Sequence, residues 1–172
     1  MDLFSTLPSV TTNRYTLSFI HTKGYFYIQG TILTAPISTD LLPDTYAVLE
    51  RYLPQIFSSQ CYNDKQLPFS KELLRTETSH LLEHILLEYL CNEKLKNGAC
   101  RASFSGVTRW YVDSPQQFEI TIKKKNMNQM LLLKALKQSL YIFDQILKTE
   151  VISTDSFLTN QINSSFADSS LS

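Results

Sequence analysis

The chain has 172 residues, of which 43% are hydrophobic and 12% aromatic. This composition excludes a disordered chain and suits one globular domain with an ordinary core. Sixteen basic and sixteen acidic residues give a formal net charge of zero. We therefore expect neither nucleic acid nor an anionic membrane as a partner, because both attract a basic face.

Three cysteines, Cys61, Cys91 and Cys100, cannot all pair with one another. Their odd count and irregular spacing indicate free thiols in a reducing compartment. The sequence also shows no signal-peptide pattern and no run near the roughly 20 apolar residues that cross a bilayer. These features predict a cytoplasmic protein.

The first predicted element is a β-hairpin over residues 14–33, where aromatic and β-branched residues flank a Lys23-Gly24 turn. A short helix is expected next. Asp40 is its candidate N-cap, and Pro54 lies near its end, where it cannot continue the helix. This half of the chain therefore begins with two strands and one helix.

A second helical pattern runs to Asn97 and is followed by Gly98, which suits the left-handed position after a helix. Ser70 is a candidate N-cap, but threonine and serine within 76–79 interrupt the helix propensity. The segment is thus either one long helix from residue 70 or a loop followed by a helix that begins near Thr76.

Two extended stretches, 99–112 and 117–124, come next around a turn-like Asp113-Ser114-Pro115. The apolar pattern over residues 127–147 predicts an amphipathic helix. Its expected apolar stripe comprises Met130, Leu133, Leu136, Leu140, Phe143 and Ile146. Residues 151–172, rich in Ser, Asn and Thr, are expected to be a disordered tail. The element order predicts a single α+β sandwich over 1–150, with an antiparallel or mixed sheet and helices mainly on one face.

The chemistry-bearing pattern is His80-Leu-Leu-Glu83-His84, inside the second helical pattern. Residues four apart on a helix are neighbours, so His80 and His84 can bind one zinc ion from the same side. Glu83 can then accept a proton from a water molecule that the metal activates. The order is the inverted form of the zinc-protease helix motif. The alternative is an amphipathic helix whose polar side happens to hold two histidines.

A zinc hydrolase normally needs a third protein ligand. Glu119, on the strand segment Phe118-Glu119-Ile120, is the first candidate, and Glu88, one turn beyond His84, is the second. Glu119 is equally well explained as a solvent-facing strand residue. Arg109 can act as a fork for a carboxylate or a developing oxyanion, or form a salt bridge with a helix carboxylate.

These residues resemble the N-terminal domain of cyanophycin synthetases, whose helix reads His-x-x-Glu-His-x-Ala-Leu-Glu-Leu. Downstream, Thr108-Arg109 and then Phe118-Glu119 resemble that domain's Thr-Arg and Val-Phe-Glu-Tyr strands in the same order. The resemblance covers roughly residues 76–122. The glycine-rich approach to the Thr-Arg strand is missing, and 172 residues leave no room for the family's ATP-dependent ligase domains.

The resemblance implies a free-standing zinc-dependent hydrolase that cuts cyanophycin, a polymer of aspartate and arginine, or a related arginine-rich peptide. It implies His80 and His84 as metal ligands, Glu88 or Glu119 completing the set, Glu83 activating water and Arg109 holding substrate. Carboxylates such as Glu77, Glu88 and Asp113 would suit a guanidinium group. The alternatives are a non-catalytic module that binds cyanophycin or a synthetase partner, and an unrelated structural protein.

Overall fold

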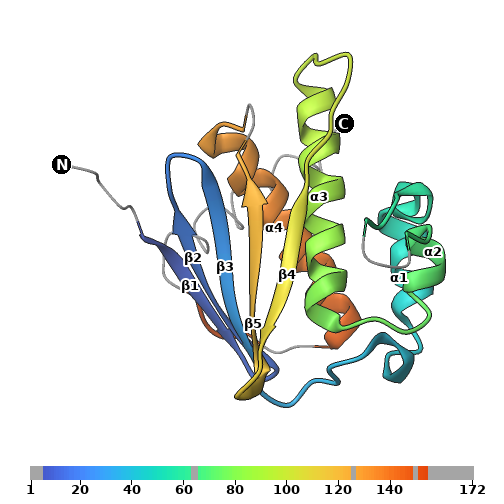
Figure 1. Ribbon diagram of the computed structural model, residues 1–172, viewed down its shortest axis with the longest axis vertical. Coiled ribbons are helices and arrows are strands. Elements are labelled where there is room, and N and C mark those ends of the chain that lie inside the picture. The colour runs from blue at the N-terminus through green and yellow to red at the C-terminus, as the bar shows by residue number, and fades with distance from the viewer. Residues whose placement is uncertain (1–5, 63–65, 125–126, 149–150, 155–172) are drawn as a thin grey trace, which may run out of the picture.

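The computed structural model describes residues 6–62, 66–124, 127–148 and 151–154. Within these residues the strands form one six-stranded antiparallel sheet in the order β4-β5-β3-β2-β1-β6. Two long helices, α3 and α4, complete the main architecture (Figure 1). The predicted single-domain α+β fold is thus confirmed.

The N-terminal part of the sheet is a three-stranded meander of β1 (Thr6–Thr12), β2 (Tyr15–His21) and β3 (Tyr25–Ile32). The predicted hairpin is present, and Thr22 closes its turn by donating to the carbonyl oxygen of Tyr25 from both its amide and its hydroxyl. β1 was not predicted, because its sequence lacks a clear apolar alternation.

The other edge of the sheet consists of β4 (Gly106–Tyr111) and β5 (Ser114–Lys123). Side chains alternate between the two faces of a strand. On β5, the fully buried Phe118, Ile120 and Ile122 face the helices, whereas Glu119 and Thr121 face the other way. The sheet therefore has one helix-covered face and one open face.

Helical segments before β4 are shorter and more divided than predicted. Asp40 lies inside a 3₁₀ turn and does not cap the following helix. The loop-then-helix alternative describes the long segment, whose helix begins at Thr78, and Gly98 adopts the predicted left-handed conformation with φ 87°. The elements are η1 (Thr39–Leu41), α1 (Thr45–Tyr52), η2 (Pro54–Ser58), α2 (Phe69–Glu72) and α3 (Thr78–Lys96).

The last helix, α4 (Gln129–Leu147), begins at Asn128, whose side chain accepts a 2.8 Å hydrogen bond from the amide of Leu131. Its buried face is rotated from the predicted stripe, since Met130 is 56% exposed. Beyond it, β6 (Val151–Thr154) pairs with β1, so four residues of the expected tail belong to the sheet. The rest of that tail, 155–172, lies outside the described residues.

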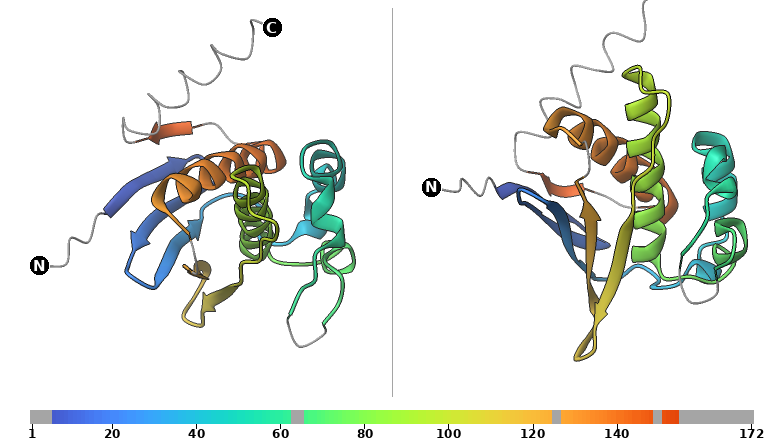
Figure 2. Two further views of the ribbon diagram at one scale, coloured as in Figure 1. Left: turned by 90° about the horizontal axis from the view of Figure 1, so that it is seen from above. Right: turned by 45° about the horizontal axis from the view of Figure 1, so that its top comes forward.

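The helices form layers on the covered face. Figure 2 shows α4 across one face of the sheet with α3 beside it, and α1 and α2 outside α3. The helices α3 and α4 contact each other, α1 contacts α4, and η2 contacts α3. One apolar core fills the space between these layers. None of the helices within the described residues is long and apolar enough to span a membrane.

Candidate metal centre

The first two turns of α3 carry His80, Glu83 and His84. Their neighbours Leu81, Leu82, Ile85 and Leu86 are all fully buried, which fixes the helix in the core. Glu83 is only 5% and His84 only 6% exposed. Burying such groups costs free energy unless they find partners. The partners of the buried Glu83 and His84 therefore show whether these residues could form a functional site.

The third candidate ligand, beside His80 and His84, is Cys61, in the loop between η2 and α2. A donor atom from each of Cys61, His80 and His84 lies within 4.8 Å of the others, so the group could hold a metal ion. Cys61 is positioned by its amide, which donates to the carbonyl oxygen of Leu67, and by a bridge between Gln60 and Pro68. These contacts hold Cys61 beside His80, near the N-terminal end of α3.

The distance between Cys61 and His80 fits shared coordination. Sγ of Cys61 lies 3.5 Å from Nε2 of His80. A tetrahedral zinc ion, with Zn–S near 2.3 Å and Zn–N near 2.0–2.1 Å, holds its sulfur and nitrogen ligands about 3.5 Å apart. This pair of atoms therefore needs little rearrangement to bind one ion.

The ring of His80 is oriented by Thr76, whose Oγ1 lies 2.7 Å from Nδ1, the ring nitrogen other than the one that faces Cys61. Thr76 is itself held, because its amide donates to Oγ1 of Thr39 and its carbonyl oxygen accepts from the amide of Thr39. When Nδ1 carries the proton, the lone pair of Nε2 faces Cys61. Such an outer partner is what fixes the tautomer of a metal-binding histidine.

His84 is held by aromatic packing. Its ring stacks on Phe69 with centroids 3.9 Å apart and lies edge-on to His80 at 4.8 Å. Burial, with a smaller contribution from His80, lowers the pKa of His84 to about 3. Burial also lowers the pKa of His80, although Glu77 and Glu72 oppose the shift. Both rings are therefore neutral near pH 7, the form that binds metals.

Glu83 points from α3 to β4. The hydroxyl of Thr108 donates a short hydrogen bond to Oε2 of Glu83, and the backbone amide of Thr108 donates to the same carboxylate. A Cβ on Gly106 would come within 2.8 Å of Oε1, so the glycine leaves room for the carboxylate. Burial raises the pKa of Glu83 to about 7, with the bonds from Thr108 opposing part of the shift.

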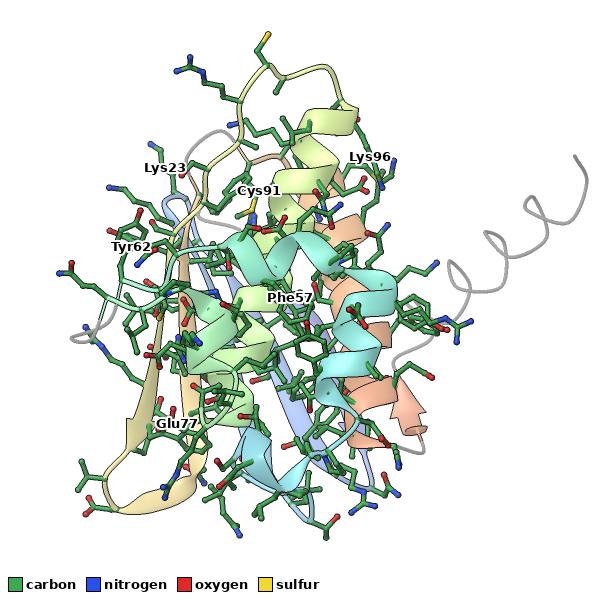
Figure 3. All side chains as sticks on the ribbon, turned by 90° about the vertical axis from the view of Figure 1, so that its right-hand side faces the viewer. Lys23, Phe57, Tyr62, Glu77, Cys91 and Lys96 are labelled. Atoms are coloured by element: carbon green, nitrogen blue, oxygen red, sulfur yellow. The ribbon has the colours of Figure 1, made fainter. Side chains whose placement is uncertain are left out.

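These groups line a cavity of about 450 Å³, a size typical of ligand sites. Its walls are the 60–62 loop, the start of α3, and β4 with the segment before it. Figure 3 looks at this side of the molecule, and the labelled Tyr62 and Glu77 both lie toward β4. Glu77 and Glu83 are the charged side chains among the lining residues, so the cavity is acidic.

The structure does not bring Glu119 or Arg109 to the histidines. Glu119 lies on the open face of the sheet, where it accepts a 3.1 Å hydrogen bond from Nε2 of Gln29. Arg109 is exposed and lies opposite Glu119 in the β4–β5 register. Each sits one residue out of phase with the side chains that face α3, so the expected ligand and the expected substrate fork point away from the cavity.

Glu88 is also outside the group. It lies on α3 beyond His84, half-buried near Cys91, where burial raises its pKa. It is not among the residues that line the cavity, and neither is Asp113, at the β4–β5 turn. Of the expected carboxylates, Glu77 and Glu83 are therefore the two at the site.

Two residues of the site were missed by sequence reasoning. Cys61 lies 19 residues before His80 in a loop, and no local spacing links it to the histidines. Thr108 was noted only as the neighbour of Arg109, yet it is the member of that pair that faces Glu83. The alternation of side chains along β4 could have identified Thr108, because it places Thr108 and Arg109 on opposite faces of the sheet.

Comparisons with models of known protein families, with curated proteins and with solved structures found no match for this chain. The class of site therefore rests on its own geometry: three donors that could hold a metal ion, beside a buried carboxylate in an open cavity.

Proposed function

We propose that this protein is a metal-dependent hydrolase, with Cys61, His80 and His84 as ligands and Glu83 as the general acid and base. The observation that carries the proposal is the convergence of three donors within 4.8 Å in a cavity that also contains Glu83. This arrangement supports the reading of the His-x-x-Glu-His helix as a metal site and replaces the expected third ligand, a carboxylate, by a thiolate.

Zinc is the metal that suits this donor set best. Thiolate and imidazole are its common ligands, and three protein ligands leave a fourth tetrahedral position for water or substrate. Bound zinc would supply Lewis acidity and lower the pKa of water toward 7. The neutral imidazoles of His80 and His84 are ready to bind without losing a proton.

Glu83 is suited to move protons in the same cavity. Its pKa of about 7 lies close to the working pH, where a carboxyl group can both accept and return a proton. The two bonds from Thr108 hold the carboxylate in one orientation, which favours proton transfer at a fixed point.

The substrate class we propose is an arginine-rich peptide, of which cyanophycin is the example implied by the sequence resemblance. The charged groups that line the cavity are carboxylates, and an exposed carboxylate such as Glu77 can pair with a guanidinium group. Arg109, on the other face of the sheet, has no part in this proposal.

A second candidate is a non-catalytic module that binds cyanophycin or a synthetase and uses zinc only to stabilise its fold. The burial of two ligands favours it, because Cys61 is 3% and His84 6% exposed, and structural zinc sites are closed. Within the described residues, however, the group supplies three donors and not the four of a closed site.

Metal analysis tests the proposal. We expect one zinc per chain in the wild type, hydrolysis of cyanophycin or of arginyl peptides, and loss of both in His84→Ala. His21→Ala is the matched control, because His21 is the chain's third histidine and lies on β2, away from the cavity. A protein without stoichiometric zinc, or a His84→Ala variant with unchanged zinc and activity, would contradict it.

Cobalt substitution separates the two candidates. An open site lets thiocyanate bind the ion and shift the visible spectrum of the cobalt protein, whereas a closed four-ligand site does not respond. A shifted spectrum together with peptide hydrolysis supports the hydrolase. An unchanged spectrum and no hydrolysis support the structural site.

A further inference from the structure

The strand beside the metal centre is an edge strand. Among the described residues, β4 is the last strand of the sheet and pairs only with β5, and Figure 1 shows it between β5 and α3. Unpaired main-chain groups of an edge strand can pair with another chain. The question is therefore which groups of β4 face the cavity and whether they are already bonded.

The register of the β4–β5 ladder shows which main-chain groups of β4 face away from β5. The amide of Lys123 donates to the carbonyl oxygen of Ser105, so the odd-numbered residues of β4 share their main-chain bonds with β5. The main-chain groups of Gly106, Thr108 and Trp110 then point away from β5. An independent contact agrees, because the amide of Thr108 reaches Glu83 on α3.

Part of this outward edge is free. The carboxylate of Glu83 takes the amide of Thr108. In the part of the chain that the structure describes, the outward amide and carbonyl of Trp110 and the carbonyl of Thr108 make no hydrogen bond outside the β4–β5 ladder. Trp110 and Thr108 both line the cavity. Unbonded donors and acceptors thus lie at the spacing of an antiparallel ladder, directly beside the metal centre.

We propose that an extended peptide binds here as an added antiparallel strand, pairing with Thr108 and Trp110 and laying an amide bond beside Cys61, His80 and His84. Main-chain pairing supplies affinity, and the alternate side chains of the peptide enter the cavity. The carboxylates of Glu77 and Glu83 favour a basic side chain there. This inference rests on the proposed function for its reading of the bound amide as a scissile bond.

An N-methyl scan of a peptide tests the docking. The probe is acetyl-Val-Thr-Val-Arg-Val-Thr-Val-amide, with one backbone amide methylated at a time, and binding to the purified protein is measured by calorimetry, with its zinc content determined separately. Each methyl group removes one donor. We expect methylation of the amides that face β4, every second one, to weaken binding roughly tenfold. The intervening amides should change it less than twofold.

Hydrogen exchange supplies the protein-side measurement. The amide of Trp110 should become at least about tenfold more protected when the unmodified peptide is added. The amide of Val112, an exposed residue in the β4–β5 turn, should not change. No binding of the peptide, equal effects of all N-methyl groups, or an unprotected Trp110 amide would overturn the docking inference.

The two proposals fail separately. If the protein binds zinc and hydrolyses peptides but the scan shows no alternation, the edge-strand inference is wrong and the hydrolase stands. If the scan alternates and Trp110 is protected but no zinc is bound, the peptide site stands and the hydrolase is wrong.

Discussion

Two carboxylates on neighbouring elements, Glu83 and Glu119, illustrate the difference between the two faces of the sheet. Glu119 lies on the open face, where Gln29 donates to it and water reaches it. Glu83 is 5% exposed on the covered face, held by Thr108, and it lines the same cavity as two neutral histidines. The open face can host charge at little cost, so a carboxylate there implies no special chemistry. On the covered face a carboxylate and two imidazoles are costly to bury, and the metal site that we propose accounts for their presence there.

The largest expected effect follows from removing the thiolate. Cys61→Ser should weaken zinc binding by at least about 100-fold, because it removes a ligand and not merely an outer partner, whose loss typically costs 10- to 100-fold. Competition with a chromogenic chelator measures the affinity. Cys100→Ser is the control, since Cys100 is exposed and outside the group. Equal affinities of the two variants would exclude Cys61 as a ligand.

The second effect is the pH dependence of folding that buried Glu83 imposes. Its pKa of about 7 in the folded protein lies above the ordinary 4.5, so its protonated form contributes stability below pH 4.5 that is lost as the pH rises through 7. At about 1.4 kcal/mol per pKa unit, Glu83→Gln should gain up to roughly 3 kcal/mol over the wild type between pH 4.5 and 8.5.

Denaturant unfolding with EDTA present measures this difference in the free energy of unfolding. Glu119→Gln, the same substitution on the open face, is the control. Parallel Glu83→Gln and wild-type curves would contradict the expected difference between the two faces.

A smaller effect is expected from the outer partner of His80. Thr76→Val keeps the side-chain shape but removes the hydroxyl that lies 2.7 Å from Nδ1. Zinc affinity should fall about 10-fold, because the ring loses the contact that fixes its orientation. Thr121→Val removes a hydroxyl on the open face and should leave the affinity unchanged. A Thr76→Val protein with wild-type affinity would show that the contact does not orient the ligand.

The smallest effect belongs to the open face itself. Arg109→Ala and Glu119→Gln should each change zinc affinity and peptide hydrolysis by less than about twofold, since the sheet separates both side chains from the cavity. Steady-state kinetics on an arginyl peptide measures this. A loss of tenfold or more in either variant would mean that the site extends to residues we place outside it.

The sequence predicted those features of the structure that are determined by residues close together in the chain. The hairpin over 14–33 and the pair His80 and His84 were predictable, because turn chemistry and the i, i+4 spacing act over a few residues. The prediction of Glu119 as the third ligand was wrong because neighbouring side chains of a strand lie on opposite faces, so a shift of one residue changes the face. Phe118 and Ile120, fully buried on either side of it, already required Glu119 to face the other way.

Cys61 could not be predicted in the same manner. It reaches His80 through a loop whose position is set by the packing of η2 and α2, a tertiary property. β6 was missed for a related reason, since a strand of four residues is too short to show an alternation of its own and is defined by its partner β1. The sequence can thus identify the candidate ligands that lie on one helix, and the candidate that completes the group comes from elsewhere in the fold.

X-ray absorption at the zinc edge of the metal-loaded protein tests the central claim most directly. The account predicts one sulfur neighbour at about 2.3 Å and nitrogen neighbours at about 2.0–2.1 Å, with the sulfur lost in Cys61→Ser. A first shell of nitrogen and oxygen alone, unchanged in that variant, would contradict it.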